Sequence, residues 1–184
     1  MKKMRAIIAS FLAVATLFTF TGCSSFKVID DEDVFFDALD DAVGIDKDET
    51  QHAKNTKVNG DKVEYVIYAK DGDNYYNYVR FKKEDDAMDY FDESYQDFDD
   101  IFAEKEFDGS HSMSLTKSRG AVVVSGELEY GHDIGKKYVS SGTELYGGIY
   151  VNKNVYIEVY SVNGSKRDKE KISTFLKAIG FPKP

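Results

Sequence analysis

Alternating apolar and polar residues between positions 51 and 81 constrain the fold of this chain more than any other feature. Apolar side chains recur at every second position, at Val63, Tyr65, Ile67 and Ala69. This spacing is typical of a β-strand that buries one face. Tight-turn signals flank this alternating run, Asn59-Gly60 before it and Asp71-Gly72 after it. We therefore expect the chain to fold back on itself as antiparallel strands.

Three other segments carry apolar residues at helical spacing. The first is expected to begin within the acidic run 30–33, whose aspartates can cap it, and to end at Gly44. The second is expected to span residues 84–105, and the third to begin after Ser165 and stop at Gly180. Strand-like runs lie between the last two helices, at residues 121–130, 137–140, 144–151 and 155–162.

Charge is distributed unevenly among these helices. Residues 30–49 contain ten acids and residues 84–108 contain twelve, whereas residues 162–184 contain six bases and two acids. Packing the basic last helix beside an acidic one would relieve repulsion. Together with the strand pattern, this predicts an α+β domain of two layers, an antiparallel sheet with three helices chiefly on one face.

A hairpin followed by an amphipathic helix is expected twice, once before residue 105 and once before residue 180. Such a repeat is produced either by internal duplication or by two independent uses of a common motif. The second explanation is favoured, because any hairpin that leads into an amphipathic helix has this pattern.

The first 22 residues have the organisation of a secretory signal peptide. Lys2, Lys3 and Arg5 precede the apolar segment 7–20. This segment has 14 residues, fewer than the roughly 20 that a membrane-spanning helix requires. A basic start, a short apolar core and small residues at its end predict that residues 1–22 are a signal peptide.

The only cysteine of the chain, Cys23, directly follows this predicted signal. Thr21-Gly22-Cys23, followed by Ser24-Ser25, resembles the lipobox of bacterial lipoproteins. The resemblance covers about the first 26 residues. It implies that a diacylglyceryl group with fatty acids such as palmitate is attached to Cys23, and that the signal is cut just before it. Two acyl chains hold a protein firmly at a membrane, so the expected location is the extracytoplasmic face of the cell membrane.

Cleavage at this site would leave residues 23–29 as a short tether and residues 30–184 as a single domain. Six extended residues, 24–29, reach at most ~20 Å, so the domain is expected to work close to the membrane. One cysteine cannot form an internal disulfide, and packing must stabilise the domain. Loss of the three bases in residues 1–22 changes the net charge from −9 to −12. A nucleic-acid partner is therefore not expected.

Residue types that often carry catalysis form no familiar motif here. His52, His111 and His132 show no i, i+4 pairing, and surface positions are expected for them. Ser and His are adjacent in Gly109-Ser110-His111-Ser112, but sequence adjacency does not produce attack geometry. The run Gly131 to Lys136 lacks the spacing and the hydroxyl residue of a phosphate loop, and it predicts a turn between strands.

The acidic residues raise the question of calcium. Two runs, Asp46-Lys47-Asp48 and Asp71-Gly72-Asp73, begin like calcium loops. Neither has glycine at the sixth position or glutamate at the twelfth. Solvated acidic helix faces are the favoured interpretation, with weak calcium binding by clustered carboxylates as the alternative. We expect no catalytic, cofactor-binding or metal-binding residues, and the one predicted site is the lipid attachment at Cys23.

Tyrosines are concentrated in the expected strands, at Tyr75, Tyr76, Tyr78, Tyr146, Tyr150, Tyr156 and Tyr160. Alternation puts Tyr76 and Tyr78 on one face, and Tyr156 and Tyr160 together. An open aromatic face can receive a peptide or a sugar, whereas a covered one forms core. The covered face is favoured, because a strand must bury one side somewhere.

The leading interpretation is a non-enzymatic lipoprotein of the cell envelope that binds a protein, a peptide or a small ligand. The alternatives are an accessory envelope hydrolase with an unrecognised site, and a structural or assembly factor. A binding module is expected to have an uncovered aromatic face or groove. A hydrolase is expected to have a pocket where His and Ser or paired acids converge.

Overall fold

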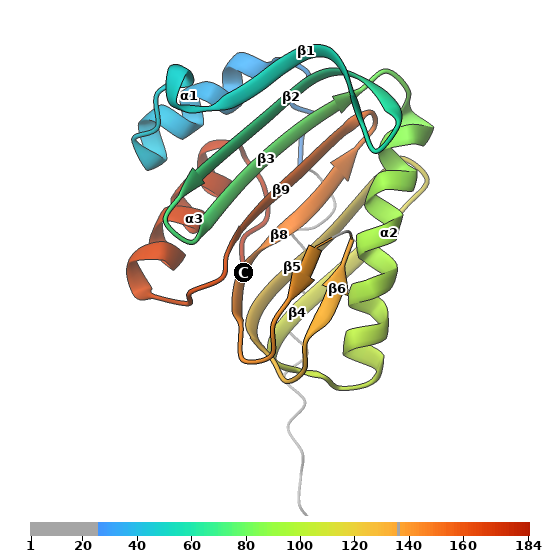
Figure 1. The fold of residues 1–184 in the computed structure, drawn as a ribbon, viewed down its shortest axis with the longest axis vertical. Coiled ribbons are helices and arrows are strands. Elements are labelled where there is room, and N and C mark those ends of the chain that lie inside the picture. The colour runs from blue at the N-terminus through green and yellow to red at the C-terminus, as the bar shows by residue number, and fades with distance from the viewer. Residues whose placement is uncertain (1–25, 136) are drawn as a thin grey trace, which may run out of the picture.

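The computed structural model describes residues 26–135 and 137–184 and is dominated by one seven-stranded sheet (Figure 1). Its strands are β1 (Gln51–Val58), β2 (Asp61–Asp71), β3 (Asn74–Phe81), β4 (Phe107–Leu115), β5 (Arg119–Leu128), β8 (Glu144–Asn152) and β9 (Val155–Ser161). A separate two-stranded ribbon consists of β6 (His132–Ile134) and β7 (Lys137–Val139). The helices are α1 (Glu32–Val43), α2 (Glu84–Ala103), α3 (Lys166–Ala178) and the short 3-10 helix η1 (Lys47–Glu49).

All neighbouring strands of the large sheet are antiparallel, in the order β1-β2-β3-β9-β8-β5-β4. This confirms the predicted α+β class, the antiparallel sheet and the three helices. The turn expected within residues 131–136 is also present, between β6 and β7. No helix within the described ranges is both long and apolar enough to cross a membrane.

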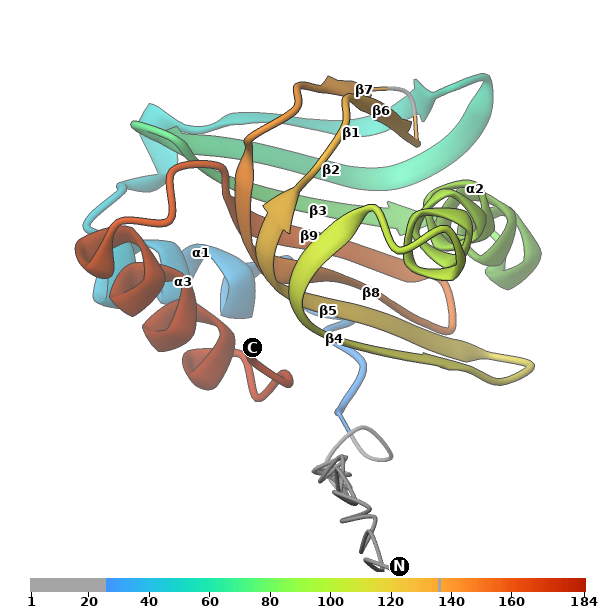
Figure 2. The same ribbon diagram turned by 90° about the horizontal axis from the view of Figure 1, so that it is seen from below.

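The helices cover both faces of the sheet, which adds a third layer to the two that were expected (Figure 2). Helices α1 and α3 pack side by side on one face, whereas α2 packs on the other. The central strands explain the difference. In β5, Ala121 and Val123 face α1 and α3, while Val122 and Val124 face α2. Because both faces of this strand are apolar, a helix on one side alone would leave the other exposed to water.

Local signals in the sequence place the helix ends. Asp31 caps α1 by accepting a hydrogen bond from the backbone N–H of Asp33 at 3.0 Å. Gly44 ends that helix in the left-handed conformation, which glycine adopts without strain. Ser165 caps α3, where its hydroxyl accepts from the N–H of Asp168 at 3.2 Å. The basic α3 lies beside the acidic α1, as charge relief predicted, and Phe35 and Phe175 meet there with ring centroids 5.1 Å apart.

The two hairpin–helix units, β2-β3-α2 and β8-β9-α3, have opposite hand. Each helix follows its hairpin directly, but α2 and α3 lie on opposite faces of the same sheet. No rotation superimposes one unit on the other with both helices in register. The similarity therefore reflects a common motif and not a duplication.

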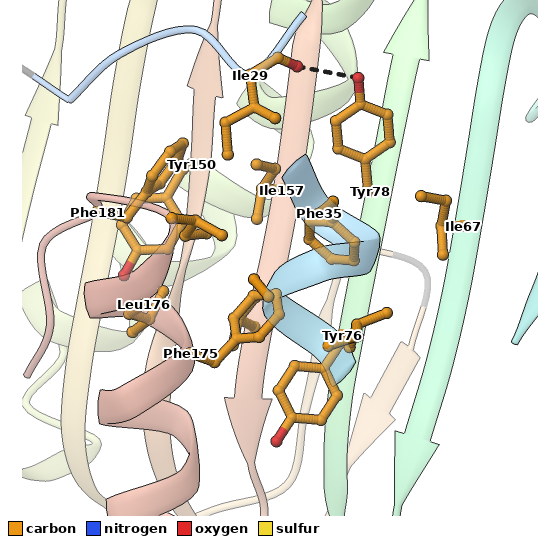
Figure 3. Close-up of a cluster of buried hydrophobic side chains, with 14 of the residues drawn as sticks. Ile29, Phe35, Ile67, Tyr76, Tyr78, Tyr150, Ile157, Phe175, Leu176 and Phe181 are labelled. Carbon is orange, nitrogen blue, oxygen red and sulfur yellow. Dashed lines mark hydrogen bonds between the residues drawn. The ribbon is translucent and has the colours of Figure 1, made fainter. Parts of the chain in front are cut away.

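The core between the sheet and helices α1 and α3 is rich in aromatic rings (Figure 3). Tyr76 and Tyr78 of β3 are fully buried there, as the favoured interpretation of the tyrosines predicted. The Tyr78 hydroxyl donates to the carbonyl of Ile29 at 2.9 Å. The Tyr76 hydroxyl is buried without a hydrogen-bond partner among the described residues.

Because only the Tyr78 hydroxyl is hydrogen-bonded, removing the hydroxyl of Tyr78 and that of Tyr76 is expected to change the free energy of unfolding in opposite directions. Tyr78→Phe is expected to lower the free energy of unfolding by about 1 kcal/mol, because it leaves the buried Ile29 carbonyl without its donor. Tyr76→Phe is expected to raise it by about 1 kcal/mol, because an unpaired hydroxyl leaves the core. Urea denaturation followed by far-UV circular dichroism measures both. If both substitutions changed the free energy of unfolding in the same direction, the assignment of one bonded and one unpaired hydroxyl would be wrong.

The first described residues belong to the core. Phe26 and Ile29 are 3% and 5% exposed. The Phe26 ring lies 4.7 Å from that of Phe181, and its carbonyl accepts from the Asn152 side chain at 2.8 Å. Residues 26–29, which were expected to be part of a tether, are therefore packed against the sheet. Only two residues, Ser24 and Ser25, lie between this packed segment and Cys23 in the sequence.

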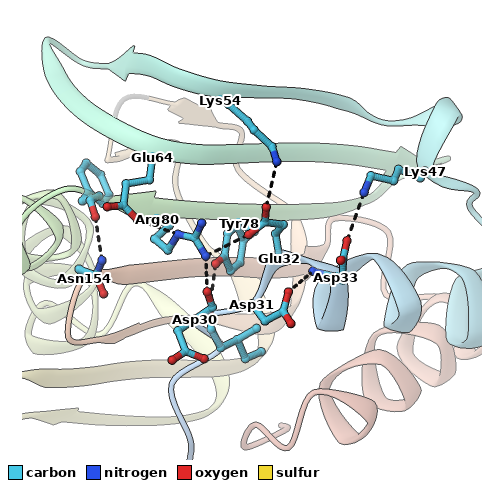
Figure 4. Close-up of polar contacts among 12 residues, drawn as sticks. Asp30, Asp31, Glu32, Asp33, Lys47, Lys54, Glu64, Tyr78, Arg80 and Asn154 are labelled. Atoms are coloured by element: carbon cyan, nitrogen blue, oxygen red, sulfur yellow. Dashed lines mark hydrogen bonds and ion pairs between the residues drawn. The ribbon is translucent and has the colours of Figure 1, made fainter.

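Charged side chains hold the chain just after this segment (Figure 4). The Arg80 guanidinium lies 3.0 Å from the carboxylates of both Glu32 and Glu64, and it also donates to the Asp30 carbonyl. Partial burial opposes ionisation of Glu32. A hydrogen bond from its own backbone N–H, together with Arg80 and Lys54, outweighs that effect and lowers the pKa of Glu32.

Candidate functional site

A groove of about 390 Å³ opens on the α2 face of the sheet, beside the β6–β7 ribbon. We call it the tyrosine groove. It is lined by Tyr68, Tyr75, Lys137, Tyr138, Val139, Ser140, Thr143, Tyr160 and Val162. In Figure 2, α2 and the short β6–β7 ribbon lie on the same side of the sheet. The groove lies where strands β2, β3 and β9 pass beneath the ribbon.

Strand register brings the central tyrosines of the groove together. Tyr75 of β3 lies directly opposite Tyr160 of β9. Their rings stack with centroids 5.1 Å apart and an angle of 22° between planes. Because side chains alternate along a strand, the positions that bury Tyr76 and Tyr78 under α1 and α3 turn Tyr75 to the opposite side. The same strand thus supplies both the core and the groove.

One ion pair includes a lining residue of the groove. Lys137 Nζ lies 3.3 Å from both carboxylate oxygens of Glu158. The Asn77 amide donates to Glu158 Oε2 at 2.6 Å, so the carboxylate is held from two sides. Lys137 Nζ also lies 5.6 Å from the ring centroid of Tyr160, within the range of a cation–π contact. The Lys137–Glu158 pair thus places one positive and one negative charge beside the stacked rings.

Lys137 and Glu158 line a second hollow of about 240 Å³ between the ribbon and α2. Its other lining residues include Asn59, Tyr90, Ser94 and Tyr156. Lys137 therefore lines both hollows, whereas Glu158 lines only this one. Burial, followed by the charges of Glu158 and Glu93, raises the pKa of Tyr90 to about 12.

Two of the groove tyrosines, Tyr68 and Tyr160, have raised pKa values. Burial, followed by the nearby charge of Glu158, raises the pKa of Tyr160 well above its ordinary value. Burial also raises the pKa of Tyr68. Protonated phenols both donate and accept hydrogen bonds, and their rings offer flat apolar surfaces. The groove is therefore equipped to bind a ligand that is part apolar and part polar.

The three histidines lie far apart in the fold, each on a strand and not in the loops that their polar neighbours suggested. His52 on β1 is exposed and contacts the Thr50 hydroxyl at 3.0 Å. His132 on β6 is half-buried, and its Nε2 lies 2.9 Å from a carboxylate oxygen of Glu106. His111 on β4 stacks on Phe102 at 3.7 Å, and partial burial lowers its pKa. No histidine pair therefore forms in the described part of the chain.

The Ser-His-Ser run on β4 does not form a nucleophile and base. Ser110 and Ser112 alternate with His111 along the strand, so their side chains leave opposite faces of the sheet. The His111 ring lies against Phe102 of α2, whereas the serines face the side of α1 and α3. This arrangement matches the expectation that sequence adjacency yields no attack geometry.

The two calcium-like runs have other contacts. The backbone N–H of Asp46 donates to the Glu49 carboxylate at 3.0 Å, at the start of η1. Asp71 pairs with Lys171 of α3, and Asp73 accepts from the Asn163 amide at 3.0 Å. Within residues 26–135 and 137–184, no group of three or more His, Cys, Asp or Glu side chains is arranged to hold a metal ion. The predicted lipid site, Cys23, lies outside the described residues.

The groove combines residues that sequence analysis named with residues it missed. Tyr75 and Tyr160 were in the tyrosine set, and Tyr156 and Tyr160 share a face as expected, but Tyr156 is buried under α2. Tyr68 and Tyr138 were missed. The alternation of β2 could have assigned Tyr68 to the face opposite Tyr65, but no local pattern shows that β7 lies over β3 and β9.

No protein-family model matches the sequence, and no curated protein or solved structure matches it either.

Proposed function

We propose that this chain is a lipoprotein, anchored through Cys23 at the extracytoplasmic face of the cell membrane, that binds a peptide segment of a partner protein in the tyrosine groove. The observation that carries the binding role is the stacked, half-buried Tyr75–Tyr160 pair beside Lys137, in a groove whose lining includes no helix residue. The anchor is supported by the lipobox-like sequence at residues 21–25.

The chemistry of the groove favours a peptide. Tyrosine and serine together are typical of surfaces that recognise proteins, because tyrosine offers a large rigid contact area and serine adaptable hydrogen bonds. Tyr138 is 70% exposed at the rim, and Ser140 lies in the same lining. Lys70 lies 5.0 Å from the Tyr75 ring, so two lysines flank the stacked pair. The ligand is therefore proposed to carry an apolar or aromatic side chain beside an acidic one.

The position of the anchor suits this role. Phe26 packs on the face of α1 and α3, and three extended residues from Cys23 to Ser25 reach about 10 Å. The tyrosine groove is on the other face of the sheet. In Figure 2 the blue start of the described chain lies below the sheet, and the β6–β7 ribbon lies above it. An anchored domain would thus hold the groove away from the bilayer, where a partner can approach.

Photo-crosslinking in intact cells tests the proposal. Tyr138→p-benzoylphenylalanine is expected to give a discrete cross-linked protein, because residue 138 lies at the rim of the groove. The matched control is Tyr130→p-benzoylphenylalanine, since Tyr130 is similarly exposed at 58% but does not line the groove. Equal products at both positions, or none at position 138, would count against a peptide-binding groove.

Once the cross-linked peptide is identified, its binding affinity measures the contribution of Tyr138. Tyr138→Ala is expected to weaken binding about 30-fold, the effect of removing an interface hot spot of about 2 kcal/mol. Tyr130→Ala is expected to leave the affinity unchanged. Isothermal titration calorimetry with the synthetic peptide measures both. A Tyr138→Ala affinity within twofold of the wild type would remove Tyr138 from the binding surface.

A further inference from the structure

A second groove, of about 460 Å³, lies on the opposite side of the sheet, between the edge strand β4 and the segment that follows α3. We call it the lysine groove. It is lined by Ser110, His111, Ser112, Val123, Lys177, Gly180, Phe181, Pro182, Lys183 and Pro184. The turn at Gly180, in the left-handed conformation, ends α3 and directs Phe181 into the core. The Tyr150 hydroxyl donates to the Pro182 carbonyl at 2.6 Å and holds this segment in place.

The lining of this groove has two chemical sides. Val123 and Phe181 are buried and form an apolar floor, while Ser110 and Ser112 contribute hydroxyls from β4. Lys177 and Lys183 stand across from them on the segment around the end of α3. A ligand with a phosphate beside a short apolar portion matches this combination, since ammonium and hydroxyl groups hydrogen-bond phosphate oxygens.

The two lysines are free to meet such a ligand. Three other lysines of the same segment are engaged: Lys166 pairs with Glu170, Lys169 with Glu144 and Lys171 with Asp71. Among the residues that the structure describes, Lys177 and Lys183 are not part of any ion pair. Two lysines without an ion-pair partner among the described residues thus line one groove of a chain whose net charge is −9.

The groove also lies beside the start of the described chain. Phe181, which lines it, packs against Phe26 with ring centroids 4.7 Å apart. Phe26 is three residues from Cys23, a reach of about 10 Å. If Cys23 carries acyl chains, this groove is held close to the bilayer surface, because Phe26 beside it is at most about 10 Å from the anchor. The tyrosine groove, on the other face, is not.

We propose that the lysine groove binds the phosphate headgroup of an anionic phospholipid in the membrane that holds Cys23. Lys177 and Lys183 would contact the phosphate, Ser110 and Ser112 would donate to its oxygens, and Val123 and Phe181 would pack on the glycerol end. This inference rests on the lipid anchor of the proposed function. It adds a second contact with the membrane, which would fix the orientation of the domain in addition to its distance.

Lysine acetylation followed by mass spectrometry tests this on the full lipoprotein, once its intact mass has shown the acyl chains. The protein is reconstituted in vesicles of phosphatidylcholine alone or with 30% phosphatidylglycerol. In the anionic vesicles, acetylation of Lys177 and Lys183 is expected to slow about fivefold, the factor expected for one lysine at an anionic surface. Lys27 is the matched control, because it is exposed and close to the anchor but does not line the groove.

Every other result of the acetylation experiment contradicts a specific part of the proposal. Equal protection of Lys27 indicates a general surface effect, and it overturns the groove site. Equal protection by inorganic phosphate in phosphatidylcholine vesicles indicates a site for free phosphate, and it overturns the lipid assignment. Absence of any protection, in protein whose mass shows the acyl chains, overturns the groove and leaves the anchor standing. A mass without acyl chains refutes the anchor itself, before the groove is measured.

Discussion

Phe26→Ala is expected to lower the free energy of unfolding by about 3–5 kcal/mol, the range for truncating a buried aromatic side chain. The Phe26 ring is 3% exposed and packs edge-on against Tyr150 and at 4.7 Å against Phe181. Alanine would leave a cavity that these rings cannot close without moving. Because the chain has no tryptophan, urea denaturation is best followed by tyrosine fluorescence and circular dichroism.

The neighbouring residue supplies the control. Lys27 is exposed, and Lys27→Ala is expected to change stability by less than about 0.5 kcal/mol. If Phe26→Ala were as mild as Lys27→Ala, residues 26–29 would behave as a tether. The reach from Cys23 would then be about 20 Å instead of about 10 Å. The anchor would then no longer hold the tyrosine groove away from the bilayer.

Cys23→Ala is expected to abolish incorporation of radiolabelled palmitate entirely, because the thiol is the only proposed acceptor of the diacylglyceryl group. It is also expected to leave residues 1–22 attached, since cleavage in bacterial lipoproteins, which residues 21–25 resemble, follows lipid transfer to the cysteine. Intact mass spectrometry of the purified protein reads both changes at once. The wild type is expected to begin at Cys23 and to carry acyl chains.

Ser24→Ala is the matched control for this experiment. It alters the same short segment but keeps the thiol, so lipid incorporation and cleavage are expected to be unchanged. Palmitate label persisting in Cys23→Ala would move the acylation to another residue. An unlabelled wild type with residues 1–22 still joined would remove the basis for an extracytoplasmic location, and with it the proposed setting of both grooves.

Helix ends and strand faces were predictable because local physics decides them. Asp31, Gly44 and Ser165 act within one turn of their own position, by capping a backbone N–H or by adopting a left-handed conformation. Likewise, alternation assigned Tyr76 and Tyr78 to one face of β3 before any partner was known. Net charge predicted that the basic α3 lies beside an acidic helix, but it did not choose α1 over α2, and the contact in the structure is the aromatic pair Phe35–Phe175.

The face that α2 covers was not predictable in this way. Its apolar stripe, with Phe91 and Phe98, is compatible with either side of the sheet. The choice depends on Val122, Val124 and Ile149, which come from distant strands and form an apolar surface only once the sheet has assembled. The burial of Phe26 is a similar case, since its partners Tyr150 and Phe181 lie more than a hundred residues away in the chain.

The sequence by itself determined the three long helices and most strands of the large sheet, though not β4, β6 or η1. It also determined the acidic character of the protein and the motif from which we infer a lipid anchor. These follow from spacings of a few residues and from composition. Only the tertiary structure decided which tyrosines are core and which line a groove, and that two unpaired lysines stand beside Phe26. The physical reason is that a groove is a gap between surfaces. Its existence depends on where distant elements stop covering one another, and no short stretch of sequence carries that information.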